Sequence, residues 1–195
     1  MPGARASTLT VSAAALAAGL ALARADPSPG VGPPRSAEVH VKAVYLYKLP
    51  PFVRWPAGAF DAPNSPFTIC VAGADPFGQA LDQAVTGQRV DRHPMVLKRL
   101  LRVDKGSGCH ILYVGASKAQ SEADELAAVS GSPVLTVTDS AVGGRASGVI
   151  DFVIKDNRVR FSVDNEAARQ NGLAISSKLL SLAVSVRPRL QEAAK

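Results

Sequence analysis

The sequence is poor in the residues from which metal and catalytic sites are built. Its 195 residues include two cysteines, three histidines and one tryptophan. The histidines are scattered at positions 40, 93 and 110, without the spaced pairs of a structural zinc site. The formal net charge is +6, but no run of Lys and Arg forms a stripe that could track nucleic-acid phosphates. We therefore expect no metal, no cofactor and no nucleic-acid partner.

Familiar catalytic arrangements are missing as well. No Gly-x-Ser-x-Gly elbow occurs, and Ser176-Ser177-Lys178 lacks the Ser-x-x-Lys order, so that Ser176 is better interpreted as a helix cap. Four aspartates lie near predicted strand ends without forming a spaced carboxylate pair, and we interpret them as exposed loop acids: Asp139, Asp151, Asp156 and Asp164. The chain is therefore not expected to be an enzyme, although an enzyme of unrecognised type remains a third alternative.

The only long apolar run is N-terminal, and no second run is long enough to cross a bilayer. Leu9–Ala23 follows Arg5 and is roughly fifteen residues long, which is typical of a signal peptide and short of a membrane span. Cleavage fits after Ala23 or, as we prefer, after Ala25. We predict a signal peptide over residues 1–25, export, and no membrane insertion after cleavage. An uncleaved anchor is the alternative.

Cys70 and Cys109 are the only cysteines of this predicted exported chain. Two cysteines in an oxidising compartment favour one disulfide, which would close a loop of about 40 residues and contribute about 4 kcal/mol in the chain-entropy model. The alternative is a pair of buried free thiols.

The pattern beyond the leader predicts one compact α/β domain. Residues 26–36 are rich in proline and glycine and are expected to form a flexible leader, and residues 37–190 the domain. Apolar strands without alternation indicate a mostly parallel central sheet flanked by helices, followed by a C-terminal β-hairpin and two helices. We expect helices over 37–49, 76–84, 117–129, 165–171 and 176–186, and strands over 66–73, 95–101, 109–115, 133–138, 149–154 and 158–163. Ser36 is expected to cap the first helix, and Glu125 to lie on the exposed side of the third. The Asp156-Asn157 pair, which can take positive φ, indicates the turn of the hairpin.

Two features permit more than one interpretation. Gly73–Gly78 follows a strand and opens a helix, as phosphate-binding loops do, but the Lys and Ser/Thr of such a loop are absent. We favour a tight turn in which Asp75 caps the helix and Pro76 is its first residue. Trp55 lies in an apolar connector and belongs either to the core or to a partner surface.

Three stretches resemble the YfiR-like family of periplasmic proteins. They are VKAVYLYKLPPFVRWP at residues 41–56, FTICVAGADPFG at residues 67–78 and, most specifically, FSVDNEAARQNGLAISSKLLSLA at residues 161–183. CHILYV at residues 109–114 and VLTVTD at residues 134–139 also fit. The likeness covers about residues 38–187.

The resemblance implies a regulator in the periplasm. The best-known member holds off an inner-membrane diguanylate cyclase by binding its periplasmic sensor region, which lowers cyclic-di-GMP signalling and biofilm formation. It also implies a compact, often dimeric α/β fold with a Cys70–Cys109 disulfide. Our leading hypothesis is therefore a repressor of such a cyclase. The alternative is a periplasmic small-ligand sensor without a cyclase partner, which would use Gly73–Gly78 and the loop at Asp139–Ser147.

The chain departs from the family pattern in three places. It has no cysteines for a second disulfide, its glycine pair before the hairpin is Ser147-Gly148, and Val163-Asp164-Asn165 stands where the family has Ile-Asn-Leu. Asp can still cap a helix in place of Asn, but a specific polar contact could be lost. The residues that we select as ligand or partner contacts are Trp55, Asp75, Asp164, Asn165 and Arg169.

Overall fold

The computed structural model describes Gly3 and residues 35–140 and 146–187. The predicted signal peptide and most of the predicted leader lie outside the described residues. The helices are α1 Arg35–Lys48, α2 Gln79–Val85, α3 Glu122–Ala128, α4 Asn165–Gln170 and α5 Ser177–Leu182, with 3-10 turns η1 Pro50–Phe52, η2 Ala57–Ala59 and η3 Lys105–Ser107. The strands are β1 Val53–Arg54, β2 Phe67–Ala72, β3 Arg89–Val90, β4 His93–Leu100, β5 Ile111–Val114, β6 Leu135–Asp139, β7 Ile150–Lys155, β8 Arg158–Asp164, β9 Ala174–Ile175 and β10 Ser185–Arg187.

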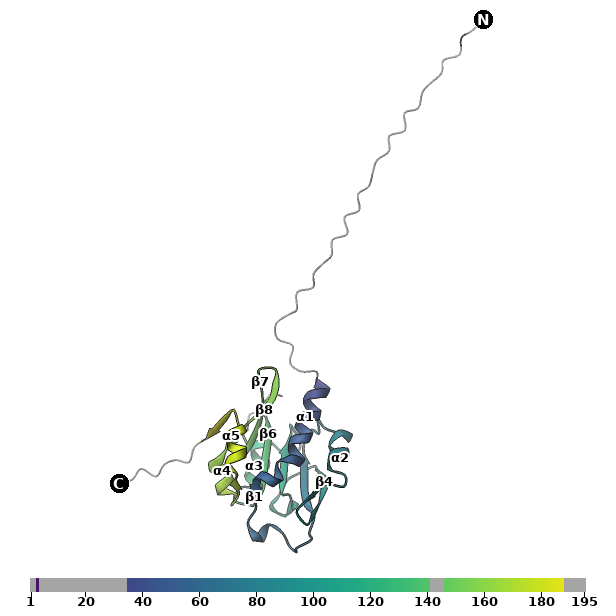
Figure 1. Ribbon diagram of the computed structural model, residues 1–195. Coiled ribbons are helices and arrows are strands. Elements are labelled where there is room, and N and C mark those ends of the chain that lie inside the picture. The colour runs from purple at the N-terminus through teal and green to yellow at the C-terminus, as the bar shows by residue number, and fades with distance from the viewer. Residues whose placement is uncertain (1–2, 4–34, 141–145, 188–195) are drawn as a thin grey trace, which may run out of the picture. The chain divides into compact units, whose positions relative to one another are not determined.

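The main sheet has the order β10-β8-β7-β6-β5-β2-β4-β3, and β1 pairs separately with β9 (Figure 1). Strands β4, β2, β5, β6 and β7 are parallel, whereas β8 returns antiparallel to β7. The predicted single α/β domain with a mostly parallel sheet and a C-terminal hairpin is confirmed. The hairpin turns at Asp156 and Asn157, which both have positive φ, as short hairpin turns require.

The central strands are buried on both faces because each contributes to two cores. In β2, Phe67, Ile69 and Val71 belong to a large core that α1 and α2 cover, and alternate residues face the other way. Cys70 and Ala72 belong to a smaller core that includes residues of α3. The helices thus lie on opposite faces of the sheet, and continuous apolar strands follow from this arrangement.

The predicted disulfide is confirmed. Cys70 in β2 is bonded to Cys109, which lies just before β5, with 5.7 Å between the Cα atoms. Neighbouring parallel strands bring the two residues together, and both are buried.

Four predicted helix boundaries are wrong. Helix α2 begins at Gln79 instead of Pro76, because the Asp75 carboxylate accepts from the N–H groups of Phe77 and Gly78 and holds a turn ahead of the helix. Helix α3 begins at Glu122 instead of Ser117, with Ser121 as its cap. Ser36 lies inside α1 instead of capping it. The last helix ends at Leu182, and residues 185–187 form β10, which pairs in parallel with β8. Ser176 does cap α5, since its hydroxyl accepts from Leu179 N–H.

The interpretation of strand-end and helix acids as exposed is also wrong for three of them. Asp139 and Asp151 are buried, because Asp139 pairs with Lys42 and Asp151 accepts from Thr138 and Ser140. Glu125, expected on the wet side of its helix, is fully buried on α3.

Candidate functional site

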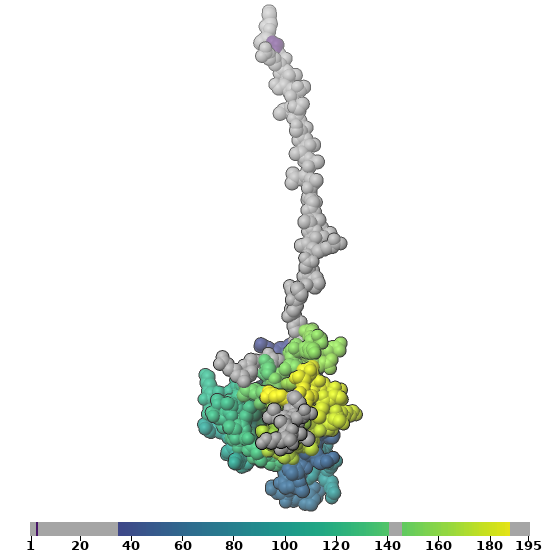
Figure 2. Space-filling view, turned by 90° about the vertical axis from the view of Figure 1, so that its left-hand side faces the viewer, coloured from purple at the N-terminus to yellow at the C-terminus, as the bar shows by residue number. Residues whose placement is uncertain are grey.

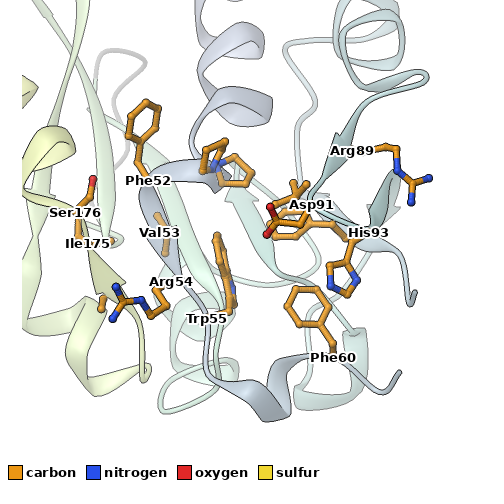
Figure 3. Close-up of a pocket in the computed structure, with 15 residues that line it drawn as sticks. Phe52, Val53, Arg54, Trp55, Phe60, Arg89, Asp91, His93, Ile175 and Ser176 are labelled. Carbon is orange, nitrogen blue, oxygen red and sulfur yellow. The ribbon is translucent and has the colours of Figure 1, made fainter. Parts of the chain in front are cut away.

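A cleft of about 690 Å³ opens beside Trp55 at the end of the domain where parallel strand β2 begins (Figure 3). Pro50, Pro51 and Trp55 come from the segment after α1, and Phe60 comes from the loop that follows. The opposite wall is the β3–β4 hairpin, from which Figure 3 shows Asp91 and His93. The volume lies within the usual range of binding pockets, and the lining combines aromatic and apolar side chains with an even larger polar surface.

Local sequence explains why Trp55 lies in this wall. Pro50 and Pro51 cannot continue α1, so the chain turns through η1 and becomes extended as β1. Strand β1 pairs antiparallel with β9, and Ser176 N–H donates to the Phe52 carbonyl at 2.9 Å. The pairing anchors the residues immediately before Trp55 and directs its indole onto the start of β2.

Aromatic rings continue from Trp55 beneath the cleft. Trp55 meets Phe67 edge to face at 5.0 Å between ring centroids, and Phe67 stacks on His110 at 4.8 Å. Phe60 lies between two imidazoles, 4.6 Å from His110 and 3.9 Å from His93. Such contacts add to simple area burial and fix the rings relative to one another. The floor of the cleft is therefore a preorganised aromatic cluster.

The two histidines of this cluster hold the loop that carries Phe60. Thr68 N–H donates to His110 Nδ1 at 3.0 Å, so the neutral ring carries its proton on Nε2 and donates to the Ala59 carbonyl at 3.0 Å. Burial lowers the pKa of His110, which favours this neutral form. His93 Nδ1 donates to the Ser65 carbonyl at 2.7 Å. Both ends of the loop are thereby tied to the sheet.

Trp55 combines the two interpretations that the sequence left open. Its ring packs against the large core, yet the residue is only half-buried and lines the cleft. Its indole Nε1 is buried and has no acceptor among the residues that the structure describes. Trp55 is therefore both a packing residue and part of the candidate binding surface.

Arginines flank the aromatic centre. Arg54 and Arg89 are exposed, and Figure 3 shows their guanidinium groups on opposite sides of the cleft. Lys178 lies 5.7 Å from the Phe52 ring centroid at the neighbouring rim. Within the described residues none of these three cations forms an ion pair with a carboxylate, and Asp91 is the acid that lines the cleft. The rim is therefore positively charged overall.

The N–H groups of the Gly73–Gly78 loop bind a carboxylate from within the loop, that of Asp75. Asp75 accepts from Phe77 and Gly78 N–H and pairs with Arg99, which also binds Asp82. This pairing lowers the pKa of Asp82 and raises that of Arg99. Gly73 has φ +70°, and a side chain there would collide with backbone at the end of β5. The tight turn that we favoured is confirmed, although Pro76 precedes the helix instead of opening it, and the N–H groups of the turn donate to the Asp75 carboxylate.

The other selected residues do not join Trp55 in the cleft. Asp75 follows the far end of β2, about 20 Å away along a six-residue strand. Asp164 caps α4 through Ala167 N–H and pairs with Arg187 at 3.0 Å. Asn165 begins that helix, and Arg169 pairs with Glu166 on its surface. These contacts stabilise the local structure. Helix α4 is therefore still capped, although Asp164 stands where the family pattern has Asn.

Sequence reasoning missed most of the cleft, because its second wall comes from the β3–β4 hairpin. Its aromatic floor also depends on Phe60 and His93, which stand in segments without a motif. Loops brought together by strand order leave no spacing signal in the chain.

The described residues contain no group of three or more His, Cys, Asp or Glu side chains placed to hold a metal ion. In the same residues, no helix has the length and apolar character needed to cross a membrane. The Cys70–Cys109 disulfide and the aromatic cleft are the features on which a functional interpretation can build.

Together, the disulfide-linked single domain and its cation-rimmed cleft define an α/β protein with a candidate binding site. The sequence profile of the YfiR/HmsC-like family matches residues 39–184, which is most of the chain, and the chain belongs to this family. The family is periplasmic and regulatory in character, as the resemblance implied. No match was found among curated proteins.

Proposed function

We propose that this protein is a periplasmic regulatory binding protein that inhibits an inner-membrane diguanylate cyclase by binding the cyclase's periplasmic sensor region. The observation that carries the proposal is membership of the YfiR/HmsC-like family over residues 39–184. Inhibition would lower cyclic-di-GMP and biofilm formation. A preformed aromatic cleft with a cationic rim supports a binding role, because aromatic and Arg side chains are enriched at protein interfaces.

The proposal also includes export by the N-terminal signal peptide, with cleavage near Ala25. The Cys70–Cys109 disulfide supports it, because disulfides persist in oxidising compartments. Homodimer formation, frequent in the family, is part of the same proposal.

The test compares a strain that carries a membrane cyclase gene beside this gene with its deletion mutant. We expect deletion to raise cyclic-di-GMP, and the gene with residues 1–25 intact to restore the low level. A copy lacking residues 1–25 should not restore it. Unchanged cyclic-di-GMP after deletion would contradict the repressor role.

A small-ligand sensor without a cyclase partner is the second candidate, and the volume of the cleft favours it. Calorimetry of the purified protein with nucleotides and amino acids tests this function. Absence of heat with all of them would count against it.

A further inference from the structure

We propose that the cleft beside Trp55 docks an acidic, extended segment of the partner protein, which places an apolar side chain between Trp55 and His93. This inference rests on the proposed function, because the partner is taken to be the periplasmic region of the cyclase. It adds the contact surface and the chemistry that the surface recognises.

The apolar anchor follows from the walls of the cleft. Trp55 stands in one wall, His93 in the other, and Phe60 lies between them (Figure 3), and Pro51 also lines the cleft. The rings are already packed by their contacts with Phe67 and with each other. A side chain entering this space would lose water contact on several sides with no rearrangement of the protein beyond a small rotation of the Trp55 ring, as interface anchors do.

The buried indole N–H of Trp55 adds a specific polar requirement. It has no acceptor among the described residues, and a buried donor without a partner is unfavourable because it has lost its hydrogen bond to water. A backbone carbonyl of an inserted segment could accept from it after a small rotation of the half-buried ring. A polypeptide supplies such a carbonyl at each residue.

The acidic character follows from the rim. Arg54 and Arg89 lie on opposite sides of the apolar centre, and neither has a carboxylate partner in the described part of the chain. Arg89 instead donates to the carbonyl of Arg92, which is itself exposed. Cations on both sides of the cleft suit a segment that carries acidic residues before and after its apolar anchor residue. Complementary charge also accelerates the association of the two proteins.

The end of the domain opposite the cleft offers a control site for the test of this proposal. In Figures 1 and 2 the segment with η1, β1 and η2 forms one end of the domain, opposite the β7–β8 hairpin. Arg158 begins β8 beside the turn of that hairpin, is exposed and has no ion pair in the described residues. It is therefore a matched control for Arg54 and Arg89.

The experiment titrates protein purified from the periplasmic fraction against spheroplasts that contain the neighbouring cyclase, and it measures cyclic-di-GMP synthesis. The variants are Arg54→Glu, Arg89→Glu and Arg158→Glu. All three sites are exposed, and circular dichroism verifies folding. We expect each cleft variant to raise the half-inhibitory concentration about tenfold, and R158E to stay within about twofold of the unmodified protein.

Inhibition that is equal for the unmodified protein and all three variants would overturn the docking proposal and leave the proposed function standing. A loss of inhibition as large in R158E as in R54E would also overturn it, because the effect would then come from net charge alone. If the unmodified protein fails to inhibit, the proposed function fails and the docking proposal fails with it.

Discussion

Lys42 Nζ lies 2.6 Å from the carboxylate of Asp139, although the two residues are 97 positions apart in the sequence. Both side chains are almost completely buried, and Lys42 also pairs with Glu38 one helical turn earlier. The Tyr113 side chain forms a hydrogen bond with the same Asp139. Burial of the Tyr113 phenol, together with the neighbouring carboxylate, raises the pKa of that phenol. The buried pair therefore joins α1 to the end of β6.

Removing one member of this pair should destabilise the fold strongly, because it leaves a charge buried without its partner. We expect Lys42→Met to lower the free energy of unfolding by about 3–5 kcal/mol in urea titrations. Adding Asp139→Leu should restore part of the loss. Equal stability of K42M and the unmodified protein would show that the ion pair does not hold α1 in place.

The disulfide should contribute measurably to stability. Reduction, or the double substitution Cys70→Ala with Cys109→Ala, opens the loop between two cysteines that are 39 positions apart in the sequence. Either change should lower the free energy of unfolding by about 4 kcal/mol. The melting temperature measured with reductant should fall well below that measured without it. Identical melting temperatures would contradict a stabilising role.

Glu125 should make the protein less stable as the pH rises. Burial, helped by the charge of Glu122, raises the pKa of Glu125 from 4.5 to about 7, so the folded protein holds its proton more tightly than the unfolded chain. Stability is therefore lost between these two pH values, by roughly 3 kcal/mol. Glu125→Gln should remove this loss in urea titrations across that range. A pH dependence that Gln leaves unchanged would show that Glu125 is solvated.

His110 should have the opposite dependence on pH. Its pKa lies below 6.5 in the folded protein, so stability is present above that pH and is lost as the pH falls through the lowered value. Protonated Nδ1 cannot accept from Thr68 N–H, and nearby Lys98 and His93 disfavour the charge while Asp61 favours it.

The fluorescence of Trp55, the only tryptophan, reports on this loop. We expect an acid transition that His110→Gln abolishes, because a neutral amide does not titrate. His40→Gln at an exposed site is the control and should leave the transition unchanged. A transition that persists in H110Q would assign it to another group.

Local patterns predicted much of the fold. Continuous apolar runs marked β2, β5 and β6, and the Asp-Asn pair marked the hairpin turn. The errors arose where tertiary contacts decide. Residues 185–187 have a helical pattern but pair with β8, and Glu125 has a surface residue type but lies on the buried face of α3. The Lys42–Asp139 pair and the cleft were beyond prediction, because both depend on which distant segments the sheet places side by side.

Hydrogen–deuterium exchange of the protein with and without cyclase-containing membranes locates the surface that contacts the cyclase. We expect slower exchange in residues 50–55 and 89–93, the two walls of the cleft, and unchanged exchange at the β7–β8 turn. Protection confined to other segments, or no protection at a concentration that inhibits the cyclase, would contradict this expectation.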